Sequence, residues 1–237
     1  MINNYAPLAH IKRHGKMKEY VKLHRQVYNE LASEYAANFK YYSNFKSERK
    51  TLSPFIKTLK ENFKKVHVLE LGPGSGLDLA DLIAAGFQTT AIDVAERIIE
   101  ECRKVAPDAN YLHGDFSEYD FKKSKFEGIF ARGFIHLFPK KDAIKVLEKV
   151  KKLLVPNGIA FIGTTKHDLP EEGYMTKEGY SRKLKRYRKK WTENELKETL
   201  RELGFKIIYT GYHVEHDKNN KTWMFPIVQL PYKPKIY

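Results

Sequence analysis

Two carboxylates stand where short apolar runs end, at a spacing that suits recognition of a nucleoside. Asp93 follows the run 88–92, about 20 residues after the first of three closely spaced glycines. Its carboxylate could accept hydrogen bonds from both hydroxyls of a ribose. Asp115 and Phe116 follow the next run, at 110–112, and an acid beside an aromatic ring could bind an adenine and stack on it. Together these residues predict a nucleoside pocket.

The three glycines form the turn that must position these acids. They follow an apolar run over 66–71 that is rich in β-branched residues, as a buried strand would be. A run with helical spacing comes next, over 77–85, and stops at a glycine. The pattern therefore predicts a strand, a glycine turn and a helix whose free N–H groups and positive dipole end face a ligand. Gly-x-Gly-x-Gly also differs from the Gly-x-Gly-x-x-Gly of dinucleotide enzymes.

Apolar runs and amphipathic runs alternate through the rest of the chain. Helical patterns cover 55–63, 95–105, 140–154 and 192–203. Runs typical of strands cover 128–131, 159–164, 205–212 and 222–230, with a turn at 217–220 between the last two. This alternation predicts an α/β domain.

The motifs at 70–76, 93 and 115–116 resemble, in order and spacing, those of the class I S-adenosylmethionine-dependent methyltransferases. The resemblance runs from about residue 28 to the end of the chain. It implies a seven-stranded, mostly parallel, twisted sheet with helices on both faces, a C-terminal antiparallel β-hairpin and an N-terminal helical cap. It also implies a transferase with a Rossmann-like fold and S-adenosyl-L-methionine as cofactor. The residues that match the family's cofactor site are Glu70, Gly72, Pro73, Gly74, Gly76, Asp93, Val94, Asp115, Phe116, Ala131 and Arg132.

The segment 28–35 reads Tyr-x-x-Leu-Ala-x-x-Tyr and continues a helical pattern that starts at residue 17. It resembles a segment that packs over the cofactor and the substrate mouth in many small-molecule methyltransferases. Tyr28 and Tyr35 are seven residues apart and should share one face of the helix. The resemblance implies a catalytic role for both, since a tyrosine over a sulfonium supplies a cation–π contact and a hydroxyl. Packing of the cap onto the core is the alternative.

The expected fourth strand is followed by Arg132 and His136, at the sheet edge where ligands bind in open α/β folds. His136 could remove a proton from a nucleophile, or it could hydrogen-bond a loop carbonyl. Arg132 could contact the cofactor or an acidic substrate. The signature of exocyclic-amine methylation, Asp/Asn-Pro-Pro-Tyr/Phe, is missing here, because 131–134 reads Ala-Arg-Gly-Phe.

The net charge of +14 is concentrated outside the expected cofactor core. We divide the chain into an arm and helical cap over 1–65 and a core over 66–237, with a basic substrate lid at about 165–191. The densest basic run, 181–191, is interleaved with aromatic residues and would suit a phosphate, a carboxylate or a nucleotide. The alternative is a solvated helix face with two aromatics anchored in the core. The substrate-binding candidates are Arg132, His136, Arg182, Arg186, Tyr187 and Trp191.

We therefore expect methyl transfer to an oxygen or nitrogen nucleophile of a small molecule, which the basic segments would favour as an anion. Two alternatives stay open: an RNA (tRNA) methyltransferase, motivated by a pI near 9.5, and a non-catalytic S-adenosylmethionine- or nucleotide-binding module. We expect a cytoplasmic monomer or homodimer with no membrane partner. Cys102 is the single cysteine, so no internal disulfide is expected. His213 and His216 would point to opposite faces of a strand, so no metal site is expected.

Overall fold

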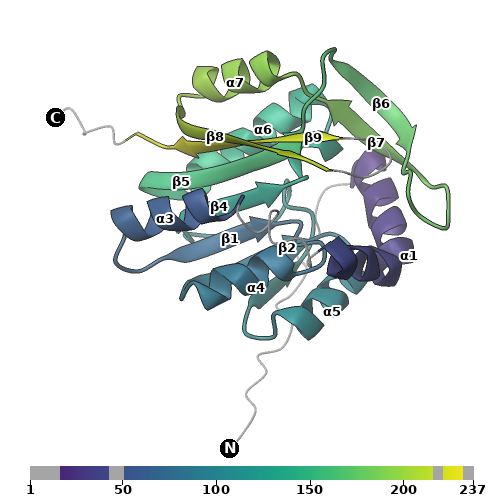
Figure 1. Cartoon of the computed structure of the whole chain (residues 1–237), viewed down its shortest axis with the longest axis horizontal. Helices are drawn as coiled ribbons and strands as arrows, with labels where there is room; N and C mark the ends of the chain where they lie inside the picture. The colour runs from purple at the N-terminus through teal and green to yellow at the C-terminus, as the bar shows by residue number, and fades with distance from the viewer. Residues whose placement is uncertain (1–16, 43–50, 216–220, 232–237) are drawn as a thin grey trace, which may run out of the picture.

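The computed structural model describes residues 17–42, 51–215 and 221–231, and Figure 1 shows the arrangement of their helices and strands. Its centre is a seven-stranded sheet with the order β3-β2-β1-β4-β5-β9-β8. The strands are β1 (His67–Leu71), β2 (Gln88–Asp93), β3 (Asn110–His113), β4 (Phe126–Arg132), β5 (Leu154–Thr165), β8 (Lys206–Val214) and β9 (Thr222–Gln229). The first five pair in parallel, and β9 pairs antiparallel with both β5 and β8. The predicted fold class is confirmed.

Helices cover both faces of this sheet (Figure 1). They are α1 (Glu19–Tyr42), α3 (Ser53–Asn62), α4 (Leu77–Ala84), α5 (Glu96–Val105), α6 (Lys140–Leu153) and α7 (Glu193–Glu202), with a short 3-10 turn, η1 (Ile135–Leu137). Successive side chains of a strand point to opposite faces. Val68 of β1 accordingly packs with α3, whereas Leu69 packs with α6 and α7. Burial on both faces explains why the consecutive residues Val68 and Leu69 of β1 are both apolar.

One interpretation of the sequence placed the basic run at 181–191 on a solvated helix face, and this is wrong. The run contains the strand β7 (Lys185–Lys190), which pairs antiparallel with β6 (Glu171–Thr176) in a separate two-stranded sheet. This β6–β7 hairpin lies beside α1 at one end of the main sheet (Figure 1). Its strand β7 also contacts η1. Of its two expected core-anchoring aromatics, Trp191 is fully buried and Tyr187 is half-buried.

No helix in the described ranges is both long and apolar enough to cross a membrane.

Candidate cofactor and acceptor site

A cavity of about 670 Å³, counting its open mouth, lies at the carboxyl ends of β1, β2 and β3. This is the edge of an open α/β sheet where ligands bind. The turn after β4 closes one side of the cavity and α1 closes another. Six residues predicted to bind the cofactor line it together: Gly72, Gly74, Asp93, Val94, Asp115 and Phe116.

All three glycines of the turn have a positive φ. They differ in which residue lies where a Cβ would be. A Cβ on Gly72 would lie 3.0 Å from the ring of Phe134, and one on Gly74 would lie 3.0 Å from the ring of Tyr35. A Cβ on Gly76 would instead meet the backbone of Cys102, with 3.1 Å to its Cα. The first two glycines therefore leave room at the cavity, whereas the third lets the start of α4 approach α5. Neither Gly76 nor Pro73 lines the cavity.

Asp93 and Asp115 are each held by a backbone N–H group. Asp93 Oδ1 accepts a hydrogen bond from Ala95 N at 2.7 Å, and Asp115 Oδ1 accepts one from Ser117 N at 2.8 Å. Burial raises the pKa of Asp93 to about 7 and raises that of Asp115 as well. In the described part of the chain neither carboxylate has an ion-pair partner within 4.0 Å. Both therefore keep acceptor capacity for a ligand's hydroxyl or amino groups.

Phe116 contributes an almost fully buried ring beside Asp115. Its ring meets that of Phe134 edge-on, with the centroids 5.9 Å apart and an interplanar angle of 87°. Phe134 also lines the cavity, although sequence analysis did not single it out. The two rings give the cavity apolar surface on which a flat heterocycle can stack.

Helix α1 supplies Tyr28 and Tyr35, which both line the cavity from one face of the helix. Their ring centroids are 5.9 Å apart in an edge-on arrangement. His24, one turn before Tyr28, lines the cavity too, and sequence analysis missed it. His24 Nε2 lies 2.8 Å from Leu137 O, so this nitrogen donates the proton and Nδ1 is an acceptor. Burial lowers the pKa of His24 to about 4, which keeps it neutral.

His136 is buried behind the cavity rather than lining it. Its Nε2 lies 3.4 Å from Nη1 of Arg188, and its Nδ1 lies 3.0 Å from Oγ1 of Thr164. A guanidinium can only donate, so Nε2 accepts from Arg188 and Nδ1 donates to Thr164. Burial first, and then the charge of Arg188, hold the pKa of His136 well below its usual range. Proton uptake by His136 would place a second cation beside Arg188.

Besides Pro73 and Gly76, three more residues expected at the cofactor lie outside the cavity. Glu70 is buried, and burial raises the pKa of its carboxyl group. Arg132 pairs through Nε with Asp78 Oδ2 at 3.2 Å and donates through Nη2 to Thr51 Oγ1 at 2.7 Å. Ala131 belongs to the core on the α6 side of the sheet. That these three residues contact a ligand stays a prediction. Their positions outside the cavity do not favour it.

The four candidates in the basic run have four different surroundings. Arg182 forms an ion pair with Glu30 of α1 at 2.5 Å. Arg186 is buried, and after the larger effect of burial its charge also lowers the pKa of His24 and of His136. Tyr187 packs against Tyr20 and Tyr174, and Trp191 lies in the hydrophobic core. None of the four lines the cavity, and Arg186 is the one whose charge acts on His24, a residue of the cavity lining.

No group of three or more His, Cys, Asp or Glu residues within the described ranges is arranged to hold a metal ion. His216, one of the two histidines considered above, lies outside the described residues.

Comparisons with known proteins agree with this architecture. Residues 68–158 match the family model described as "Methyltransferase domain". Among curated proteins, the chain is 26% identical over 101 residues to the biotin biosynthesis bifunctional protein BioHC of Cellvibrio japonicus. It is 30% identical over 126 residues to the uncharacterized protein RP028 of Rickettsia prowazekii. These matches cover 42% and 47% of this chain but only 20% and 50% of the two relatives.

Similar solved structures cover far more of the chain. A 1,6-didemethyltoxoflavin-N1-methyltransferase of Burkholderia thailandensis, solved with 1,6-didemethyltoxoflavin and S-adenosylhomocysteine, aligns with a TM-score of 0.70 at 20% identity. The alignment covers 92% of this chain and 93% of that one. The DhpI–SAH complex aligns with a TM-score of 0.67 at 18% identity, covering 92% of this chain and all of DhpI. At these identities the likeness establishes the fold. Residues 68–158 thus match the methyltransferase-domain model, within a chain that has the fold of the class I S-adenosylmethionine-dependent methyltransferases.

Proposed function

We propose that the protein is an enzyme that binds S-adenosyl-L-methionine in this cavity and transfers a methyl group to an oxygen or nitrogen atom of a small, anionic molecule. The observation that carries the proposal is the meeting of the glycine turn, Asp93, Asp115 and Phe116 around one cavity. It is supported by the similar structures, which were solved with bound S-adenosylhomocysteine and, in one case, with 1,6-didemethyltoxoflavin.

The residues present fit this cofactor. Asp93 would accept hydrogen bonds from the ribose hydroxyls, and Asp115 with the ring of Phe116 would hold the adenine. The free N–H groups where α4 begins would face the charged end of the ligand. When bound, the cofactor would supply a methyl group on a positively charged sulfur. The protein then has to align the acceptor and exclude water from it.

We infer that Tyr28 and Tyr35, rather than His136, contact the reacting centre. Both tyrosines line the cavity, and their ring faces can stabilise a positively charged sulfur. The acceptor nitrogen of His136 is engaged by Arg188, and its low pKa makes it a weak base. We therefore assign His136 the role of orienting Arg188.

The pairing and burial of cations in the basic run at 181–191 favour a small acceptor over RNA. Arg182 pairs with Glu30, and Lys190 pairs with Glu171 at 2.5 Å. Arg186 is 8% exposed, too little for contact with a polynucleotide backbone. These cations are neutralised or enclosed rather than displayed in a surface stripe.

Calorimetric titration with S-adenosylmethionine and S-adenosylhomocysteine tests the proposal. We expect micromolar binding of both ligands. Asp93→Ala should weaken binding by on the order of 2–3 kcal/mol, because charge-assisted hydrogen bonds to the ribose are lost. Asp108→Ala, at an exposed turn, is the matched control and should bind as the wild type does. If neither ligand binds the wild-type protein, the proposed activity is excluded. A methyl-transfer assay with acidic small molecules then separates an enzyme from a binding module.

A further inference from the structure

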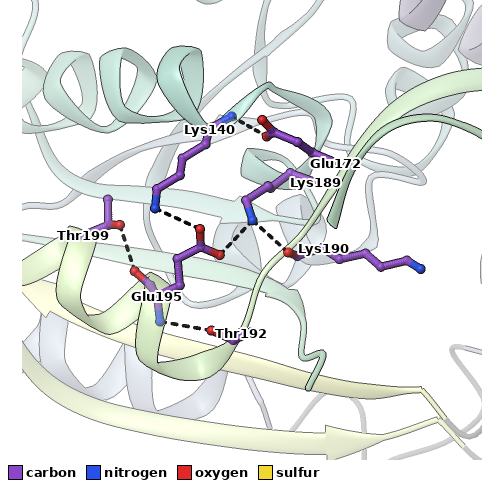
Figure 2. A network of polar contacts seen from close by, with 7 residues as sticks. All are labelled: Lys140, Glu172, Lys189, Lys190, Thr192, Glu195 and Thr199. Atoms are coloured by element: carbon purple, nitrogen blue, oxygen red, sulfur yellow. Dashed lines mark hydrogen bonds and ion pairs between the residues drawn. The ribbon is translucent and has the colours of Figure 1, made fainter. Parts of the chain in front are cut away.

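The β6–β7 hairpin and the loop between its strands contain two buried lysines in opposite electrostatic situations. Lys189 is 2% exposed, and its ammonium group has two oxygen partners, one of them a carboxylate, shown in Figure 2. Its Nζ lies 2.7 Å from Glu195 Oε2 and 3.0 Å from Lys190 O. Glu195 is itself held by Lys140 at 2.9 Å and by Thr192 at the start of α7. This is how a protein normally accommodates a buried charge.

Lys177 is 8% exposed and has no carboxylate within ion-pair distance among the described residues. Its Nζ faces three aromatic rings instead, at 5.3 Å from the centroid of Tyr28, 5.2 Å from that of Tyr35 and 4.2 Å from that of Tyr180. Tyr28 and Tyr35 are the residues of α1 that line the cavity. Lys177 therefore lies directly behind the tyrosine wall of the proposed methyl-transfer site.

Arg186 and Arg188 add two guanidinium groups to the same region. Arg186 is 8% exposed, and its Nε and Nη1 atoms are buried with no hydrogen-bond partner in the described structure. Arg188 donates to Thr165 Oγ1 at 2.7 Å and to His136 at 3.4 Å, which are neutral partners. β-strand alternation puts Arg186 and Arg188 on the same face of β7, whereas Lys189 faces the other way.

The charges around this cluster are nearly all positive. Lys177 N donates to Leu184 O at 2.9 Å across the hairpin, so strand alternation puts Lys177 on the same face as Arg186 and Arg188. Burial first, and then the charges of these two guanidinium groups, lower the pKa of Lys177 well below its usual range. The neighbouring histidines, His24 and His136, are neutral. One carboxylate, Glu215, acts on Arg188, but it is already held by Trp223 Nε1 at 2.7 Å and lies 4.0 Å from Lys221.

Enclosing Lys177 and Arg186 beside Arg188 is unfavourable, because burial removes hydration and no carboxylate of the described residues forms an ion pair with any of the three. A ligand that brings the missing negative charge would remove this cost. Guanidinium groups with unused N–H donors match the oxygens of a phosphate or carboxylate.

We propose that Lys177, Arg186 and Arg188 form a receptor for an oxyanion group of the methyl acceptor, a step that rests on the proposed function. Three positive charges favour a dianionic group such as phosphate over a single carboxylate. Because the receptor borders Tyr28 and Tyr35, an acceptor anchored there by its anionic end would extend toward the cavity. The enclosure of Lys177 and Arg186 favours a small molecule over a polynucleotide.

Calorimetric titration with inorganic phosphate, at constant ionic strength and with S-adenosylhomocysteine present, tests the receptor. We expect one saturable site in the wild type and weaker binding of acetate. Lys177→Met and Arg186→Met should each weaken phosphate binding by about tenfold or more. Lys185→Met removes an exposed cation of the same hairpin and should stay within about twofold of the wild type. Absence of a saturable phosphate site, or equal affinity in all four proteins, would overturn the proposal.

Thermal unfolding without phosphate gives a second, independent readout. Lys177→Met replaces an unpaired buried cation with an apolar side chain of similar length, so the melting temperature should rise. Lys189→Met breaks the paired network of Figure 2 and should lower it. If Lys177 serves only to hold the three tyrosine rings together, Lys177→Met will lower the melting temperature and leave phosphate affinity unchanged, which would sink the receptor.

The two proposals fail in distinguishable ways. Binding of S-adenosylhomocysteine without binding of phosphate overturns the receptor and leaves the cofactor site intact. Saturable, Lys177-dependent phosphate binding without binding of S-adenosylhomocysteine overturns the cofactor site and leaves the anion site intact. A short single-stranded RNA that displaces phosphate in a Lys177-dependent manner would overturn the small-molecule assignment.

Discussion

Asp93 lies at the end of β2 with one carboxylate oxygen on Ala95 N, and burial raises its pKa to about 7. Its charge state therefore changes within the physiological range of pH. The ionised form is the one that accepts two hydroxyl hydrogen bonds, whereas the neutral form is the one that an empty, buried site favours. Ligand binding and protein stability should consequently respond to pH in opposite directions.

The affinity for S-adenosylhomocysteine should rise by roughly tenfold between pH 6 and pH 8 and then level off, since ionisation of Asp93 precedes ribose binding. Calorimetry across this range measures the effect. Asp93→Asn should bind weakly at every pH and lose most of this dependence. A wild-type affinity that is flat from pH 6 to pH 8 would contradict the assignment.

The ligand-free protein should behave inversely. The pKa of Asp93 is higher in the folded state than in the unfolded state, so the buried charge destabilises the fold fully above pH 7. This cost fades as the pH falls through 7 toward the unfolded value of 3.8. Asp93→Asn should therefore raise the melting temperature by at least about 2 °C at pH 8 and change it little near pH 4. An equal shift at both values of pH would point to a cause other than charge.

At the scale of elements, Gly76 of the glycine turn has a packing role that does not depend on a ligand: it lets α4 approach α5. Gly76 begins α4 at a φ of +80° with the backbone of Cys102 close to it, whereas Gly86 has a φ of +88° with nothing within 4 Å of its missing Cβ. Both glycines adopt a left-handed backbone conformation, but only Gly76 has a neighbouring backbone where a Cβ would be. They therefore form a matched pair of sites.

Gly76→Ala should destabilise the protein by more than Gly86→Ala does. The latter should cost about 1 kcal/mol for its left-handed backbone. The former should cost roughly 2 kcal/mol or more, because α5 must also shift. Urea denaturation of the two variants measures the difference. An equal decrease in the free energy of unfolding for both variants would show that α4 and α5 can move apart without cost.

The β6–β7 hairpin is tied to α1 by polar contacts at its tip. Glu34 accepts hydrogen bonds from Ser181 N at 2.8 Å and from Ser181 Oγ at 2.6 Å, next to the Arg182–Glu30 ion pair. The rings of Tyr35 and Tyr180 also stack, at an interplanar angle of 5°. These contacts hold the hairpin against the tyrosine wall of the cavity.

Glu34→Ala should increase amide hydrogen exchange across 177–184 with a small effect on global stability, because the contacts are exposed. Exchange measured by mass spectrometry checks this expectation. Glu61→Ala removes an exposed ion pair on α3 and is the control, with unchanged exchange in the hairpin. Unchanged exchange in Glu34→Ala would mean that the aromatic contacts alone hold the tip.

At the scale of the whole molecule, a net charge of +14 will attract nucleic acid without specificity. We expect bulk tRNA to bind weakly and with steep salt dependence, so that the complex dissociates between about 0.05 and 0.2 M salt. Filter binding measures this. Methyl transfer to tRNA that persists at about 0.2 M salt would contradict a small-molecule acceptor.

The sequence by itself determined the fold class and which residues after β1, β2 and β3 line one side of the cavity. The glycine turn, Asp93, Asp115 and Phe116 follow buried strands directly, so local patterning placed them at one edge of a parallel sheet. Six of the predicted cofactor residues meet there. Glu70, Ala131 and Arg132 belong to the same motifs but do not line the cavity, because Glu70 and Ala131 are buried within the sheet and Arg132 pairs with Asp78.

Only the tertiary structure decided which basic residues face the proposed acceptor. The run 181–191 has no apolar periodicity, so nothing local distinguishes a helix, which would align Arg182 with Arg186, from a strand, which aligns Arg186 with Arg188. Pairing of β7 with β6 settles the period, and docking on α1 encloses Lys177 against Tyr28 and Tyr35. Whether a cation is paired depends on carboxylates distant in sequence, as Glu195 is for Lys140, and such contacts exist only after folding.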